Sequence, residues 1–112
     1  MTMRPLPIAL ILALVLAAPA AAATRNVKVD DDFFVKSGNP PTVTVKRGTT
    51  VKFNWTGSRQ HNIVTVSGPK NIECGLRRRG SCERKARKAG TYKLQCSIHA
   101  PDMAMTLRVK KP

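Results

Sequence analysis

Hydrophobic and polar residues alternate with a period of two along most of the chain beyond residue 24. Successive side chains of a strand point to opposite faces, so this period indicates strands that bury one face. The positions expected to point inward are Val27, Val29, Val43, Val45, Val51, Phe53, Trp55, Val64, Val66, Tyr92, Leu94, Cys96, Met103, Met105, Leu107 and Val109. Turns containing glycine or proline separate these runs, and no segment shows a helical stripe of useful length. The pattern predicts an all-β sandwich or barrel.

The alternation stops in residues 70–88, which contain eight basic and two acidic residues. This segment also contains two of the three cysteines, Cys74 and Cys82. We expect it to be a connection between strands, with one further strand at residues 81–88.

The first 23 residues differ from the rest of the chain. Arg4 gives a charged start, residues 6–18 are almost wholly apolar, and small residues follow Pro19. This order is typical of a secretory signal peptide. The apolar run is shorter than the roughly 20 residues that a membrane-spanning helix needs, and no cysteine follows it for lipid attachment. We therefore favour cleavage near Ala23 over retention as an anchor, which predicts a signal peptide at residues 1–23, one domain at residues 24–112, and a periplasmic or secreted protein.

Charge limits the choice of partner. Residues 24–112 contain 19 of the 20 basic residues and all 6 acidic ones, which leaves a net charge of +13 on 89 residues. Such a charge favours an anionic partner, either an acidic redox protein or an anionic membrane or envelope surface. Export and the few aromatic residues argue against nucleic acid. The candidate docking residues are Arg77, Arg78, Arg79, Arg84 and Lys85. An equal alternative is that their charge only keeps the protein in solution.

The cysteine count points to one thiol with a function. An odd number of cysteines in an oxidising compartment leaves one unpaired. Cys74 and Cys82 flank a short loop with glycines near both ends, so they can form a disulfide across a hairpin. A bridge would also help a domain of this size, whose core alone gives marginal stability. Cys96 is then the free thiol.

Cys96, His99 and Met103 lie within eight residues, at the junction of two predicted strands. A thiolate, an imidazole and a thioether form a soft ligand set that suits copper, which in blue sites is held by two histidines and a cysteine with a weak axial methionine. His61 is the only other histidine and completes such a set. Zinc is the next choice but prefers sites without thioether. A catalytic Cys–His pair would need a third orienting residue, and none can be named, so we do not expect an enzyme.

The segment Gly90-Thr91-Tyr92-Lys93-Leu94-Gln95-Cys96-Ser97-Ile98-His99 resembles the G-T-Y-x-[FLY]-x-C-[ST]-x-H strand and ligand loop of the cupredoxins, or blue copper proteins. Residues 42–51 are similar to the family's T-V-x-x-G-x-x-V strand pair, and His61-Asn62 is similar to its first-ligand motif. The resemblance implies a small Greek-key β-sandwich that binds one copper ion through His61, Cys96, His99 and Met103. It also implies that Asn62 ties the His61 loop to the backbone near Ser97.

Two functions fit this resemblance. The first is a one-electron carrier, with His99 as the partly exposed route for the electron, and we expect such a carrier to be a monomer. The alternative is a copper carrier or sensor, but such proteins more often display exposed clusters of methionine and histidine. Only Met103 and Met105 remain after residue 23, which favours the electron carrier. Met105 is the rival axial ligand, although its place one step farther into the strand suits a core residue better.

Overall fold

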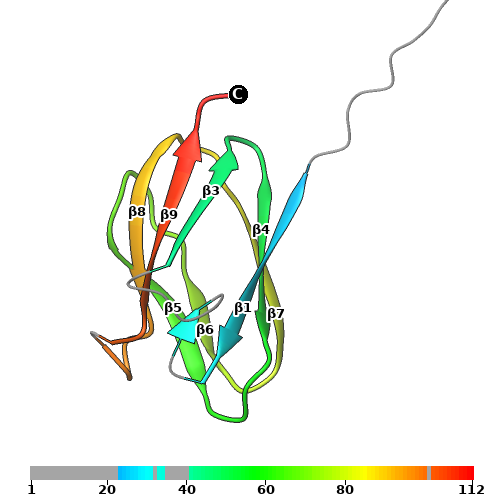
Figure 1. Cartoon of the computed structure of the whole chain (residues 1–112), viewed down its shortest axis with the longest axis vertical. Helices are drawn as coiled ribbons and strands as arrows, with labels where there is room; N and C mark the ends of the chain where they lie inside the picture. Colours follow the sequence, from blue (N-terminus) through cyan, green and yellow to red (C-terminus); the bar gives the residue numbers. More distant parts are fainter. Residues whose placement is uncertain (1–22, 32, 35–40, 101) are drawn as a thin grey trace, which may run out of the picture.

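A computed structural model describes residues 23–31, 33–34, 41–100 and 102–112, which form nine β-strands (Figure 1). The strands are β1 (Thr24–Asp30), β2 (Phe33–Phe34), β3 (Thr42–Lys46), β4 (Thr50–Trp55), β5 (His61–Ser67), β6 (Cys74–Arg77), β7 (Gly80–Lys85), β8 (Gly90–Gln95) and β9 (Ala104–Lys110). Among these residues no helix is long and apolar enough to cross a membrane. The predicted signal peptide lies outside the described residues, apart from Ala23.

The strands form two sheets that face each other (Figure 1). One sheet has four strands in the order β2-β1-β4-β7, and the other has five in the order β3-β9-β8-β5-β6. The pairs β1–β4 and β3–β9 are parallel, and the remaining pairs are antiparallel. The prediction of an all-β sandwich is confirmed.

Alternation along the strands forms the core between the sheets. In β4, for example, Val51, Phe53 and Trp55 are buried, while the residues between them are partly exposed. Burying one face of each sheet is what makes the two layers adhere, because each buried large apolar side chain contributes roughly 1.5–3 kcal/mol. Met103, Met105, Leu107 and Val109 are buried together at the start of β9 and along it, as their spacing predicted.

The predicted inward face of β5 is wrong. Val66 is 58% exposed and Val64 is only partly buried, whereas His61 and Ile63 are fully buried. The pairing of β5 with β6 shifts register between His61 and Ile63, and its pairing with β8 shifts between Thr65 and Ser67. The alternation continues through residues 61–64, but β5 buries the face opposite to the one that the two valines indicated.

Residues 70–88 contain two strands, β6 and β7, instead of the single strand that we expected at residues 81–88. β6 pairs with β5 and β7 pairs with β4, so the two strands are the edges of different sheets. Cys74 and Cys82 form a disulfide that joins these edges. The bridge therefore links the two sheets, and does not close a hairpin within one sheet.

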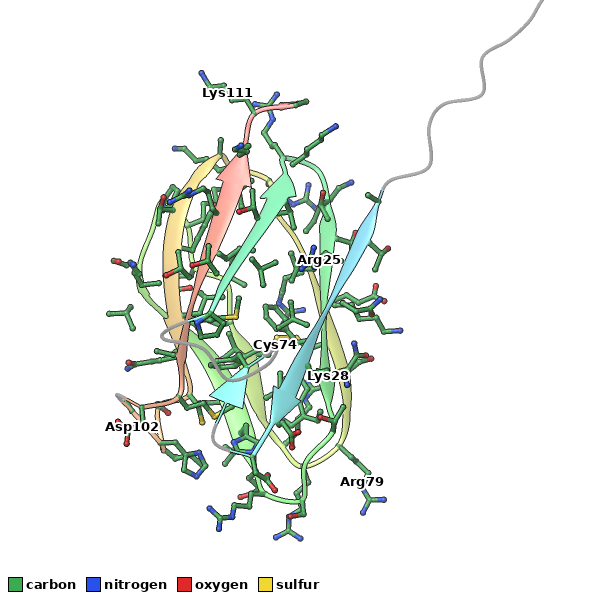
Figure 2. All side chains as sticks on the ribbon, viewed as in Figure 1. Arg25, Lys28, Cys74, Arg79, Asp102 and Lys111 are labelled. Atoms are coloured by element: carbon green, nitrogen blue, oxygen red, sulfur yellow. A yellow bond between two sulfur atoms is a disulfide. The ribbon has the colours of Figure 1, made fainter. Side chains whose placement is uncertain are left out.

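One end of the sandwich collects the loops that carry the candidate site. β1 ends there at Asp30, β4 at Trp55 and β8 at Gln95, while β5 begins there at His61 and β9 at Ala104. We call this the ligand end; it comprises Asp31, His61, Arg77 and the described residues of the loops at 56–60, 78–79, 96–100 and 102–103. Figure 2 shows Arg79 and Asp102 at this end and Lys111 at the opposite end.

Candidate metal centre

Three potential metal ligands meet at the ligand end. His61 opens β5, Cys96 directly follows β8, and His99 lies in the loop before β9. Their ligand atoms all lie within 4.8 Å of one another. Nδ1 of His61 is 3.3 Å from Nδ1 of His99 and 3.9 Å from Sγ of Cys96, and the distance from Sγ to Nδ1 of His99 is 3.4 Å.

Two of these residues are enclosed by the core. The side chains of His61 and Cys96 are fully buried, and His99 is partly exposed. Trp55 fixes the backbone at His61, because its indole Nε1–H donates a hydrogen bond to the His61 carbonyl at 3.0 Å. A buried thiol with two imidazoles around it can bind a metal ion without rearranging the strands that carry it.

The loop at residues 96–103 is closed by its own backbone. The Cys96 N–H donates to the Met103 carbonyl at 3.0 Å, the His99 N–H to the Cys96 carbonyl at 3.2 Å, and the Met103 N–H to the His99 carbonyl at 3.2 Å. These bonds hold Met103, which is fully buried, next to the other two residues of the loop. Met105 lies inside the sheet, opposite Leu94 of β8.

Asn62 connects the two loops that carry the histidines. Its Oδ1 accepts a hydrogen bond from the Ser97 N–H at 2.8 Å, and its Nδ2 donates to Ser97 Oγ at 2.9 Å. The structure thus contains the contact that the family resemblance implied. It holds the residue after His61 against the residue after Cys96.

Asp31 is a residue of the site that the sequence analysis missed. Its Oδ1 lies 3.0 Å from Nε2 of His61, on the far side of the ring from Cys96. Hydrogen bonds from His61, Ser58 and Arg59 hold the pKa of the Asp31 carboxyl well below its usual range. The only signal in the sequence was the acidic run at residues 30–32 in a strongly basic chain.

Comparison with known proteins identifies the architecture. No model of a protein family matches the sequence, and no curated protein matches it either. Solved structures do match. A purple cupredoxin from Nitrosopumilus maritimus is 21% identical, with a TM-score of 0.62 over 77% of this chain and 99% of that chain. An oxidised amicyanin mutant is also 21% identical, with a TM-score of 0.64 over 77% of this chain and 81% of that chain.

This chain has the cupredoxin fold. A Cu-containing nitrite reductase from Thermus scotoductus also matches, at 24% identity and a TM-score of 0.67, but the 91% of this chain that aligns spans only 25% of that enzyme. The cupredoxin fold thus occurs both in small cupredoxins and as part of an enzyme.

The donor set fits one copper ion. Two imidazole nitrogens and one thiolate are ligands that copper accepts in both of its common oxidation states, and a cupredoxin fold brings them together here without help from another chain. Cys74 and Cys82 are joined to each other, so Cys96 is the free cysteine among the described residues. This agrees with the division of the cysteines that their spacing predicted.

The five candidate docking residues do not lie together. Arg77 of β6 pairs with His61 of β5, and its guanidinium lies 5.1 Å from the centre of the Trp55 ring. Arg78 and Arg79 follow Arg77 in the adjacent turn. These three arginines belong to the ligand end. Arg84 and Lys85 lie at the other end of β7, roughly 13 and 17 Å from Gly80 at about 3.3 Å per residue.

A depression of about 490 Å³ opens beside His99, Ala100, Asp102 and Met103. Ile98, in the same loop, is 54% exposed, although large apolar side chains are usually buried. His99 is therefore the ligand candidate that solvent or a partner can approach.

Proposed function

We propose that this protein is an exported type 1 copper protein that carries one electron at a time. The observation that supports it most is the convergence of His61 Nδ1, Cys96 Sγ and His99 Nδ1 within 4.8 Å at one end of a cupredoxin fold. A bound copper ion would supply the redox chemistry by alternating between Cu(I) and Cu(II). The protein itself holds the ligands, excludes water and presents a surface to the partner.

We assign Met103 as the fourth residue that would hold the copper ion. It is fully buried and is tied by backbone hydrogen bonds to both Cys96 and His99. Met105 sits inside the sheet opposite Leu94, where its role is to fill the core. A thioether would be a weak donor to the copper ion, which favours reversible electron transfer over tight binding of one oxidation state.

Contacts within the protein hold the candidate ligands His61 and Cys96. His61 and Cys96 adjoin strands that are paired on both sides, and the contact between Asn62 and Ser97 links their loops. A centre that moves little when its charge changes needs little reorganisation for each electron. The complete burial of His61 and Cys96 also favours retention of the metal, which supports an electron carrier over a copper-delivering protein.

We further propose that the electron leaves and enters at His99. Exposed Ile98 offers an apolar contact near the depression beside His99, and Arg77, Arg78 and Arg79 place positive charge at the same end of the molecule. An acidic redox protein matches both features. The positive field would accelerate the encounter more than it tightens the complex.

A visible spectrum of the copper-loaded protein tests the copper assignment. The oxidised protein should be intensely coloured, owing to charge transfer from the Cys96 thiolate to Cu(II). Cys96→Ser should remove the colour, because an alcohol does not supply that donor orbital. A colourless copper-loaded protein, or one that prefers zinc, contradicts the proposal. Rapid loss of copper to a weak chelator, with slow electron exchange, would favour the copper carrier instead.

The salt dependence of electron transfer tests the docking surface. In the test variant, glutamine replaces Arg77, Arg78 and Arg79. In the matched control, glutamine replaces Lys85, Arg87 and Lys88 at the other end of the sandwich, so both variants lose three positive charges. Transfer from an acidic partner should slow as salt rises, because the Debye length falls from about 30 Å at 0.01 M to about 10 Å at 0.1 M.

The arginine variant should lose most of this dependence, and the control variant should keep it. Equal behaviour of the two variants would mean that only net charge matters. Binding of the wild type to anionic vesicles, with no salt effect on transfer to the acidic protein, would favour a membrane or envelope surface as the partner.

A further inference from the structure

Asp31 supports His61 from the side of the ring that faces away from Cys96. It lies in the turn after β1, thirty residues before His61 in the chain. Its side chain is 31% exposed, whereas that of His61 is fully buried, so the carboxylate separates the imidazole from solvent. The 3.0 Å distance from Oδ1 to Nε2 is that of a good hydrogen bond.

This contact determines which nitrogen of His61 carries the hydrogen. An ionised carboxylate can only accept hydrogen bonds, so Nε2 must be the donor. In the neutral imidazole, Nδ1 then keeps its lone pair. Nδ1 is the atom that faces Cys96 Sγ at 3.9 Å and His99 Nδ1 at 3.3 Å. The hydrogen bond therefore prepares the ligand atom for a metal.

The Asp31 carboxylate is itself held firmly. It accepts hydrogen bonds from the backbone N–H groups of Ser58 at 3.1 Å and Arg59 at 2.9 Å, and from the Ser58 hydroxyl at 3.1 Å. Gly57 allows this close approach, because a Cβ at position 57 would lie 2.6 Å from Cγ of Asp31 and 2.7 Å from its backbone N. The loop at residues 56–60 thus wraps around the carboxylate and leads directly into His61.

We propose that Asp31 is a positioning residue that holds His61 in the Nε2–H tautomer and makes its Nδ1 a stronger donor, and thereby lowers the reduction potential of the centre. A carboxylate hydrogen-bonded to a ligating histidine fixes the ring and raises its basicity. The negative charge also favours the more highly charged ion, Cu(II). The effect on the tautomer concerns the metal-free protein, whereas the effect on the potential rests on the proposed copper site.

Four variants separate the contribution of the hydrogen bond to His61 from that of the negative charge. Asp31→Ala removes both the acceptor and its charge, and Asp31→Asn keeps an oxygen that can accept from Nε2–H but removes the charge. Gly57→Ala keeps the carboxylate and displaces it. Asp102→Asn is the control, because it removes one negative charge from an exposed position next to Met103.

The first measurement is the ¹⁵N NMR spectrum of the His61 ring in the metal-free protein at one fixed pH. The wild type and Asp31→Asn should carry the hydrogen on Nε2, and Asp31→Ala and Gly57→Ala should populate the Nδ1–H tautomer. A wild type with the hydrogen on Nδ1, or a folded Asp31→Ala protein with an unchanged tautomer, overturns the proposal. This result does not depend on copper, so it stands or falls separately from the proposed function.

The second measurement is copper affinity and reduction potential. Loss of such a supporting partner typically costs 10–100-fold in metal affinity, and we expect Asp31→Ala to lose that much for Cu(II) and less for Cu(I). Each tenfold excess of the Cu(II) loss over the Cu(I) loss raises the potential by about 59 mV. Asp31→Asn should raise it more than Asp102→Asn does. Equal shifts in these two variants would reduce the effect of Asp31 to the loss of one negative charge and refute the tuning role.

Discussion

Replacing Cys74 and Cys82 with alanine should lower the free energy of unfolding by about 2.5 kcal/mol. The two cysteines are eight positions apart, and closing a loop of that length in the unfolded chain costs roughly 8 cal/mol/K of entropy, or about 2.5 kcal/mol at 25 °C. The bridge also joins the edge strands of the two sheets, β6 and β7, so its loss removes the covalent link between the layers. For a domain of about 60–100 residues such a change lowers Tm by roughly 10–20 °C.

Urea unfolding of the metal-free protein measures this loss directly. The reduced wild type should match the double variant, because both lack the bridge. Alkylation of the native protein before unfolding should modify at most one thiol, Cys96, which is buried. The reasoning is wrong if the variant loses less than about 1 kcal/mol, or if the native protein yields two further modifiable thiols. The visible spectrum should be unchanged, since neither cysteine belongs to the ligand set.

Three further predictions concern the axial ligand, the core and the N-terminus. Met103→Leu should keep the coloured centre and raise its reduction potential, because a weak donor to Cu(II) is lost. Met105→Leu should change the stability of the protein only modestly. If the two variants behave the other way round, Met105 is the ligand and Met103 is not. Burial raises the pKa of the Tyr92 phenol, so the unfolded chain loses this proton first and stability should fall as pH rises above about 10. Denaturation at pH 9 and 11 measures this fall, and a Tyr92→Phe variant should show less of it. If export is correct, N-terminal sequencing of the mature protein should begin at Thr24.

Much of the fold followed from the sequence because one face of most strands is buried without interruption. Alternation identified the inward residues of β1, β3, β4, β8 and β9. It failed for β5, where His61 and Ile63 lie on the buried face and Val66 is exposed. Both faces of β5 carry apolar residues, and which of them meets the core is decided by the place of the strand in the sheet.

The ligand loop was predictable for a similar reason. Cys96, His99 and Met103 lie within eight residues, so local spacing alone brings them together between two strands. His61 could be added because the chain contains only two histidines. Composition and short-range spacing were therefore sufficient to select His61, Cys96 and His99, which the fold brings together, and Met103 as a ligand stays a prediction.

Contacts between distant segments were decided only by the tertiary structure. Asp31 meets His61 across thirty residues because β1 and β4 pair in parallel and end side by side, which no local pattern encodes. The disulfide links the two sheets because β6 pairs with β5 whereas β7 pairs with β4. The same pairings place Arg77 beside His61, while Arg84 lies far along β7. Which residues share a strand follows from sequence, but which strand ends share a site follows from how the sheets are assembled.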